Sequence, residues 1–278
     1  MNTDVIELKK KAVEIRREVL EMIMRSKTGH IGSDFSCTEI LVALYYGVMN
    51  VNPKKPGMPG RDQYVQSKGH AVETLWAILA DKGFFKRSEL ETFSQFGTRL
   101  IGHPNNKVEG VEMNTGSLGH GLPISVGVAL AGKMDSQDFH TYTLMGDGEL
   151  AEGSVWEGAM SAAHFKLDNL TAIIDRNGLQ ISGPSEMIMG VEKLKAKWEA
   201  FGWEVQEVDG NDIAVLINVL KTPNLTGKPK VIIASTVKGK GISYMENQPE
   251  WHHKVPTPEE YEQAVKELKK QWEVLENA

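Results

Sequence analysis

The sequence has little cysteine, no long apolar run and no excess of basic charge. Cys37 is the single cysteine among 278 residues, so no disulfide can form within the chain. This fits a cytoplasmic location, although a cysteine-poor exported protein would look the same. Every apolar run falls far short of the roughly 20 residues of a membrane-spanning helix. The charged N-terminus lacks the apolar segment of a secretory signal. We therefore expect a protein without a membrane partner.

The charge balance also narrows the range of partners. Lysine and arginine number 31 against 37 aspartate and glutamate, which gives a net charge of −6. This acidity does not favour nucleic acid as a partner. The length suffices for one large α/β domain or two small ones. Because no linker divides the chain, we expect a single domain over residues 1–278.

Short apolar runs alternate with amphipathic stretches. Apolar residues recur at helical spacing over residues 5–25, and the segment Lys27 to Gly32, with two glycines, is expected to break this helix. Further helices are expected at 37–49, 122–133 and 258–275, the last as a charged surface or subunit-docking helix. Strands are expected at 64–66, 142–145, 170–174, 203–208 and 230–236. The alternation predicts an α/β fold with a mostly parallel sheet sandwiched by helices.

An acid and an amide follow two of the expected strands. Gly146-Asp147-Gly148 ends the strand at 142–145, and Asn177 follows the strand at 170–174. The carboxyl ends of parallel strands lie at one edge of a sheet, where open α/β folds bind ligands. Gly-Asp-Gly alone also fits a plain strand–helix turn, but Asn177 at the next strand end favours a site. Aspartate and asparagine oxygens suit Mg²⁺ holding a diphosphate.

Histidines beside glycines mark several loops. The pairs are Gly29-His30, Gly69-His70 and Gly102-His103, and His252 follows Trp251 further on. Imidazole can donate to phosphate or move protons near neutral pH. Zinc is the alternative, but the histidines lack zinc-ligand spacing and the single cysteine gives no support. We expect His140 and His164 to be structural, and His253 fits an ordinary neighbour of His252.

Residues 97–121 contain six glycines and two histidines and are expected to be irregular. A loop of that length in a compact domain is usually functional. Its end, Thr115 to Gly121, is rich in glycine but has no Walker lysine, so it is not a P-loop. Lys238-Gly239-Lys240-Gly241 follows an expected strand and fits either a phosphate contact or a charged surface turn.

Taken together, these motifs resemble the N-terminal, thiamine-diphosphate-binding half of transketolase. The resemblance covers almost the whole chain, in the family's order. It includes Gly29-His30, Ser67 to Ala71, Gly102 to Pro104, Thr115 to Gly121, Gly146 to Gly153, Asp175 to Gly178, Lys238 to Gly241, and Trp251-His252. It implies thiamine diphosphate and Mg²⁺ or Ca²⁺ as cofactors, and sugars or sugar phosphates as substrates.

The resemblance also implies roles for individual residues. The metal would be bound by the side chains of Asp147 and Asn177 and by the carbonyl of Leu179. The diphosphate would be held by Gly148 and His70, with His252 near it. The cofactor rings would contact Gly116, Ser117 and Leu118. Proton transfer at the sugar would involve His30, His103 and His252. Glu152 resembles the acid that links the two active sites of the dimer. His120 and His253 depart from the family pattern.

The chain ends without the family's pyrimidine-binding domain, whose glutamate activates the cofactor. Either the protein is a natural half-enzyme or it is a piece of a longer chain. The start methionine and the finished amphipathic tail favour the natural half-enzyme. We therefore expect a partner carrying the missing domain, in a heterotetramer.

The reaction implied by the resemblance is transfer of a two-carbon ketol unit from a ketose to an aldose. Two alternatives stay open. One is a different thiamine-diphosphate reaction, either deoxyxylulose-phosphate synthesis or 2-oxo acid decarboxylation. The other is a non-catalytic role in assembly. Intact Asp147, Asn177 and histidines speak against the latter, and the glycine–histidine loops favour transketolase.

Overall fold

The computed structural model describes residues 5–277, so the two ends of the predicted domain lie outside it. Its centre is a five-stranded sheet in the order β1-β2-β3-β7-β6. All neighbouring pairs run parallel, which confirms the predicted α/β architecture. The strands are β1 (Gln63–Gln66), β2 (Thr141–Gly146), β3 (Leu170–Arg176), β6 (Glu204–Asp209) and β7 (Lys230–Ser235).

The central strands are buried on both faces, as expected for a parallel sheet covered by helices. Side chains alternate between two separate apolar cores, because successive residues of a strand point to opposite faces. Ile173 belongs to one core and Ile174 to the other. The edge strand β6 is only partly buried. This pattern explains why the central strands read as continuous apolar runs.

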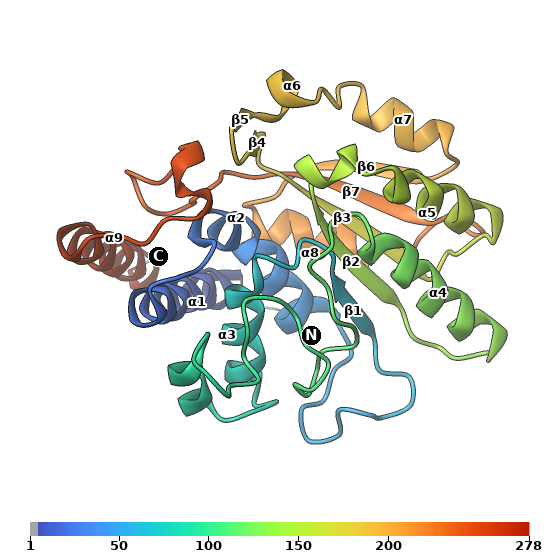
Figure 1. Ribbon diagram of the computed structural model, residues 1–278. Helices are drawn as coiled ribbons and strands as arrows, with labels where there is room; N and C mark the ends of the chain where they lie inside the picture. Colours follow the sequence, from blue (N-terminus) through green and yellow to red (C-terminus); the bar gives the residue numbers. More distant parts are fainter. Residues whose placement is uncertain (1–4, 278) are drawn as a thin grey trace.

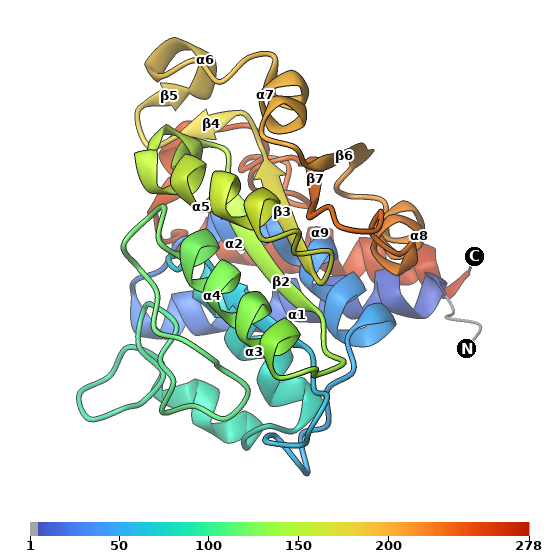
Figure 2. The same cartoon turned by 90° about the vertical axis from the view of Figure 1, so that its right-hand side faces the viewer.

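Three helices cover one face of the sheet, namely α4 (Gly121–Met134), α5 (Gly153–His164) and α7 (Leu194–Ala200). In Figure 2, α4 and α5 lie next to each other in front of β2 and β3. Leu122, Val155 and Trp198 join the core on this face. The two glycine-rich loops at 115–121 and 146–148 therefore lead into elements of the same layer.

Five helices lie on the opposite side of the sheet, and the C-terminal helix packs on the N-terminal one (Figure 1). They are α1 (Val5–Ser26), α2 (Ile31–Val42), α3 (Val72–Lys82), α8 (Ile213–Lys221) and α9 (Pro258–Glu276), and a π-helical segment, Ala43–Val48, continues α2. The predicted C-terminal helix is present as α9. Its buried residues Ala264 and Leu268 join this core, so its apolar side packs within the chain.

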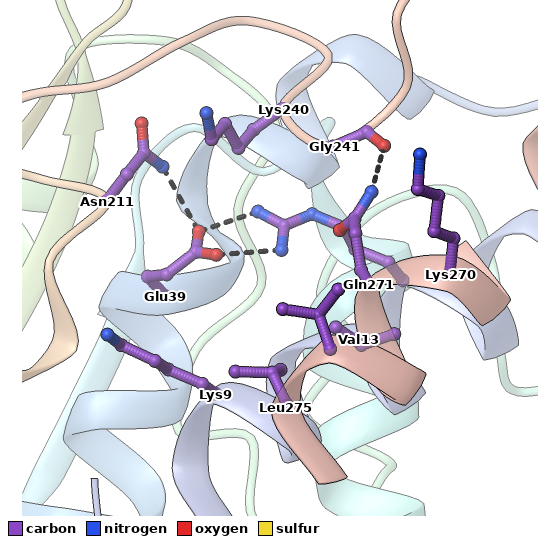
Figure 3. A pocket seen from close by; sticks show the side chains of 11 residues that line it. Lys9, Val13, Glu39, Asn211, Lys240, Gly241, Lys270, Gln271 and Leu275 are labelled. Atoms are coloured by element: carbon purple, nitrogen blue, oxygen red, sulfur yellow. Dashed lines mark hydrogen bonds and ion pairs between the residues drawn. The ribbon is translucent and has the colours of Figure 1, made fainter. Parts of the chain in front are cut away.

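A buried ion pair links helices α1 and α2 of this layer. The Arg16 Nη2 on α1 lies 2.6 Å from Glu39 Oε2 on α2, and Asn211 Nδ2 donates to the same oxygen at 3.1 Å. On α9, Gln271 donates to the carbonyl of Gly241. Figure 3 shows Glu39, Asn211 and Gln271 around a cavity of about 380 Å³, which Arg16 also lines. The loop at 236–241 is thus tied to the outer helices.

The second helix begins at Ile31 rather than at the predicted residue 37. The sequence pattern indicated a helix break at Gly32, but this residue lies in the first turn of α2. A Cβ there would lie 2.6 Å from the carbonyl oxygen of Trp251. This glycine therefore allows a close approach of two segments and does not end a helix.

The remaining short elements lie in the loops. They are the 3-10 helices Arg87–Thr92, Gly148–Ala151 and Pro249–His252, the hairpin of β4 (Leu179–Gln180) and β5 (Gly183–Pro184), and α6 (Ser185–Ile188). Residues 97–120 contain no helix or strand, which agrees with the prediction for 97–121 except that Gly121 begins α4. Over residues 5–277, no helix has the length and apolar character needed to cross a bilayer.

Candidate functional site

The ends of β2 and β3 form the base of the candidate site. Gly146 pairs with Asp175 across the two strands. Asp147 and Asn177 therefore follow neighbouring strand ends, as predicted from the sequence. Both line one cavity of about 370 Å³, which the β4–β5 hairpin also borders.

Asp147 organises the loops around this cavity. Its Oδ1 accepts a hydrogen bond from the amide of Gly148 at 2.9 Å. Its Oδ2 accepts from the amide of Gly178 at 2.9 Å and from Ser185 Oγ at 3.0 Å. Burial, followed by the charge of Asp175, raises the pKa of Asp147. A buried carboxylate with this environment is well suited to a cation.

The oxygens near Asp147 fit a hard cation. Asn177 Oδ1 accepts from the amide of Leu179 at 3.1 Å, which fixes the amide orientation. Pro184, opposite Leu179 in the hairpin, has no N–H that could occupy the Leu179 carbonyl. No cluster of three or more His, Cys, Asp or Glu side chains suited to a metal occurs among the described residues. A cation here would be bound by carboxylate, amide and backbone oxygens, a set suited to Mg²⁺ or Ca²⁺.

Three predicted histidines converge at the cavity. His30 immediately precedes α2, His70 lies just before α3, and His252 ends the 3-10 helix at Pro249–His252. The ring centroids are 5.1 Å apart for His30 and His70, 5.3 Å for His70 and His252, and 5.5 Å for His30 and His252. These histidines lie far apart in the sequence, so their spacing along the chain could not show that their rings are close together. The fold brings them together.

These imidazoles are neutral at physiological pH. Burial, then the charges of His253 and His103, lowers the pKa of His30 to about 4. Burial and the Lys238 charge lower the pKa of His252 to about 3. The pKa of His70 lies well below its usual value, chiefly because of burial. A neutral imidazole carries one donor and one acceptor nitrogen, so it can both give and receive a proton.

His103 and His253 border the same cluster without lining the cavity. A Cβ on Gly116 would lie 2.9 Å from His103 Cδ2, which places His103 against the 115–121 loop. The His253 ring lies 4.7 Å from that of His30, although its side chain is exposed. From the sequence, His253 was expected to be an ordinary neighbour of His252. Its position next to His252 was the available signal.

Two lysines line the cavity but differ in their environment. Lys68 Nζ forms an ion pair with Asp175, and both side chains are buried. Burial opposes the charge on Lys68, but Asp175 outweighs it and raises the pKa. Lys238 has no acidic partner of this kind among residues 5–277, and its Nζ lies 2.9 Å from His252 Nδ1. Burial, then the charge of Lys68, lowers the pKa of Lys238 to about 8.

A further buried donor supports an anionic ligand. Gln180 borders the cavity, and its buried Nε2 has no hydrogen-bond partner within the described part of the chain. Buried polar groups are nearly always paired, so an orphaned donor indicates a ligand or water. Together with the Lys238 amine, it fits a diphosphate. Neither residue was singled out individually from the sequence, although Lys238 lay in a noted motif.

Glu149 holds the glycine-rich loop at 115–121 in place. Its Oε1 accepts from the amide of Gly119 at 2.8 Å and from Ser67 Oγ, and its Oε2 accepts from the amide of Gly146 at 3.1 Å. A Cβ on Gly121 would lie 2.3 Å from Ser67 Cβ, so the close approach requires glycine. Glu149 was not among the site residues predicted from the sequence. An acid directly after Gly148 was the signal.

The structure places some, but not all, of the residues predicted to contact the cofactor in the cavity lining. Gly116 and Leu118 line the cavity, as do Gly148 and Leu179. Ser117 and Glu152 are exposed and lie outside the lining. His120 is exposed, with its Nδ1 3.1 Å from the carbonyl of Leu118. Glu152 immediately precedes α5 at the surface.

The chain is similar to known proteins over nearly its full length. Residues 8–276 match the family described as transketolase, thiamine diphosphate binding domain. The chain is 48% identical over 277 residues to one of the subunits of apulose-4-phosphate transketolase from Phocaeicola vulgatus, covering 99% of this chain and 98% of that protein. It is 41% identical over 273 residues to 6-deoxy-6-sulfo-D-fructose transketolase subunit SqwG of a Clostridium species, covering 98% and 99%.

A crystal structure of transketolase from Campylobacter jejuni matches the fold with a TM-score of 0.89 and 31% sequence identity. That match covers 98% of this chain but 43% of the Campylobacter chain, so this protein spans less than half of its length. The strand-end site, the fold and the sequence similarity all agree. The chain belongs to the transketolase family and has its thiamine-diphosphate-binding fold.

Proposed function

We propose that the chain is the N-terminal, thiamine-diphosphate-binding subunit of a split transketolase. It would transfer a two-carbon ketol unit from a ketose or ketose phosphate to an aldose or aldose phosphate. The observation that carries this proposal is the single cavity in which Asp147 and Asn177 meet the histidine cluster. The relatives named as transketolase subunits, which have nearly the same length, support it.

Thiamine diphosphate, when bound, supplies the carbon nucleophile and the electron sink for breaking and forming a carbon–carbon bond. Lys238, Gln180 and His70 would donate hydrogen bonds to its diphosphate. Gly148 would allow backbone amides to approach, and Gly116, Ser117 and Leu118 would contact the rings. Asp147, Asn177 and the Leu179 carbonyl would hold Mg²⁺ or Ca²⁺.

The neutral histidines would handle protons at the sugar. An imidazole whose pKa is lowered by burial is available as a base at neutral pH. His30 and His103 would contact the sugar hydroxyls, and His252 would serve both the sugar and the cofactor. The packed rings of His30, His70 and His252 fix the positions of these nitrogens relative to one another.

The proposed partner is a C-terminal transketolase subunit with a pyrimidine-binding domain, in a heterotetramer. Exposed apolar side chains beside the cavity support coverage by another chain. Ile181, which lines the cavity, is 71% exposed, and Met187 is 83% exposed. Glu152 would link two active sites of the assembly. We further propose that residues 1–278 form one domain and that the protein is cytoplasmic, which its buried free thiol Cys37 suits.

The test combines the chain with the product of a neighbouring gene that encodes the missing domain, with thiamine diphosphate and Mg²⁺. We expect two-carbon transfer from a ketose phosphate to an aldose phosphate. Asp147→Ala should abolish it, whereas Asp138→Ala, at an exposed position, should not. Turnover of pyruvate instead would indicate decarboxylation or deoxyxylulose-phosphate synthesis. No turnover, or full activity of Asp147→Ala, would overturn the proposal.

A further inference from the structure

Two carboxyl groups are buried against each other beneath the histidine cluster. Asp34 lies in the first turn of α2 and Glu73 in the first turn of α3, and they are 0% and 1% exposed. The two carboxyl groups are neighbours, because Asp34 Oδ1 accepts a hydrogen bond from the amide of Thr74, the residue directly after Glu73. Neither belongs to the cavity lining or to the set of residues assigned above.

Each carboxyl has one oxygen with a backbone donor. Asp34 Oδ1 accepts from the amide of Thr74 at 2.9 Å, and Glu73 Oε1 accepts from the amide of His30 at 3.3 Å. The other two oxygens, Asp34 Oδ2 and Glu73 Oε2, are buried with no donor from any described residue. Two ionised carboxylates cannot hydrogen-bond to each other, because both are acceptors only. One proton between them supplies the missing donor for both oxygens.

The surrounding charges agree with a single shared proton. Lys68 is the cation that acts on Asp34, but its amine is paired with Asp175. The nearby Cys37 is a neutral thiol, since burial raises its pKa. His30 presents its backbone amide to Glu73 and has a neutral ring. Burial, then the charge of Asp34, raises the pKa of Glu73 well above its usual value.

The carboxyls join the two helices that carry histidines of the site. His30 immediately precedes α2, and His70 lies two residues before α3. Gly29 permits the contact, because a Cβ on it would lie 2.6 Å from Glu73 Oε1. Thr74 Oγ1 also donates to the Asp34 carbonyl, at 3.1 Å. A change in the contact between Asp34 and Glu73 therefore changes the spacing of the two imidazoles.

We propose that Asp34 and Glu73 share one proton and act as a positioning pair that sets the distance between the His30 and His70 rings. Neither residue touches substrate or cofactor. Loss of the shared proton leaves two buried anions, which repel and separate the first turns of α2 and α3. Only the consequence for turnover rests on the function proposed above.

Thermal unfolding against pH tests the shared proton. In the unfolded chain Glu73 releases its proton near its ordinary pKa, whereas the folded protein retains it. The folded state then binds more protons, so this pair makes stability fall as pH rises. Glu73→Gln places a permanent donor opposite Asp34 and does not titrate. The Tm of Glu73→Gln minus the Tm of the wild type should increase steadily from about pH 5 to about pH 9. Glu91→Gln, at an exposed position, should follow the wild type.

A second measurement tests positioning in the full chain. The Cε1–H NMR signals of His30 and His70 should keep their wild-type shifts in Glu73→Gln and move in Glu73→Ala. Asp34→Asn, which also leaves a donor between the helices, should resemble Glu73→Gln. With the partner present, Glu73→Gln should extend activity to higher pH. A pH-independent Tm difference for Glu73→Gln would overturn the shared proton. Unchanged NMR signals of His30 and His70 in Glu73→Ala would overturn the positioning role of the pair. This measurement needs no turnover, so it is independent of the proposed function.

Discussion

Substitution of Lys68 by methionine should destabilise the protein strongly. Lys68 and Asp175 form a buried ion pair, with side chains 2% and 0% exposed. Removing one member of such a pair leaves a buried charge without its partner, which costs about 3–5 kcal/mol. Asp175 would still accept hydrogen bonds from Ser36 and Thr236, so we expect the lower part of that range.

A cost of about 3 kcal/mol corresponds to a fall in Tm of roughly 6–12 °C for a domain of this size. Urea unfolding followed by circular dichroism would measure the change in free energy directly. The double variant Lys68→Met/Asp175→Asn removes both charges. It should recover much of the loss, because no buried ion is left unpaired.

Two results would refute this reasoning. If Lys68→Met unfolds within about 1 kcal/mol of the wild type, Asp175 does not depend on the lysine for neutralisation. If the double variant is as unstable as the single one, the destabilisation comes from lost packing rather than from an unpaired charge. The double-mutant cycle separates these cases, since both substitutions lie at one contact.

Three further predictions concern neighbouring groups. Lys238→Met should leave the free energy of unfolding nearly unchanged, because the substitution leaves no buried anion without its partner. It should weaken thiamine diphosphate binding about 10- to 100-fold, measured by calorimetry, because a charge-assisted hydrogen bond is lost. Gly32→Ala should cost about 1–3 kcal/mol in urea unfolding, since the new Cβ meets the Trp251 carbonyl; an unchanged midpoint would contradict this close contact. The pKa of His30 is lowered from 6.5 to about 4 in the folded protein. The neutral His30 therefore contributes at most about 3 kcal/mol to folding stability, and this contribution should be lost as the pH falls from 6.5 to about 4. His30→Gln should flatten the acid side of a Tm-against-pH curve, and an unaltered curve would contradict the lowered pKa.

The sequence was sufficient for features that depend on local patterns. The apolar runs of β2, β3 and β7 and the residues after their ends follow from strand periodicity and strand chemistry. The pairing of Asp147 with Asn177 at one sheet edge needed only the rule for parallel strands. The loop positions of His30, His70 and His252 marked them as candidates, but their individual roles came from the family resemblance.

Features that depend on contacts between distant segments were beyond the sequence. Gly32 looked like a helix breaker because its role is to admit Trp251, which lies far along the chain. Glu149 and Lys68 are charged residues whose buried partners lie in other segments of the chain, a loop for Glu149 and strand β3 for Lys68. A pattern within one segment cannot show which charge will be neutralised by another segment.

The strand order has a consequence for how the protein is made. β6 precedes β7 in the chain, yet β7 lies between β3 and β6 in the sheet. During synthesis β6 therefore has no neighbour until Lys230–Ser235 has emerged, and the edge of β3 stays open meanwhile. Open strand edges promote association between chains. His252 emerges later still, so the histidine cluster can close only after β7 and the segment that follows it to His252 have left the ribosome.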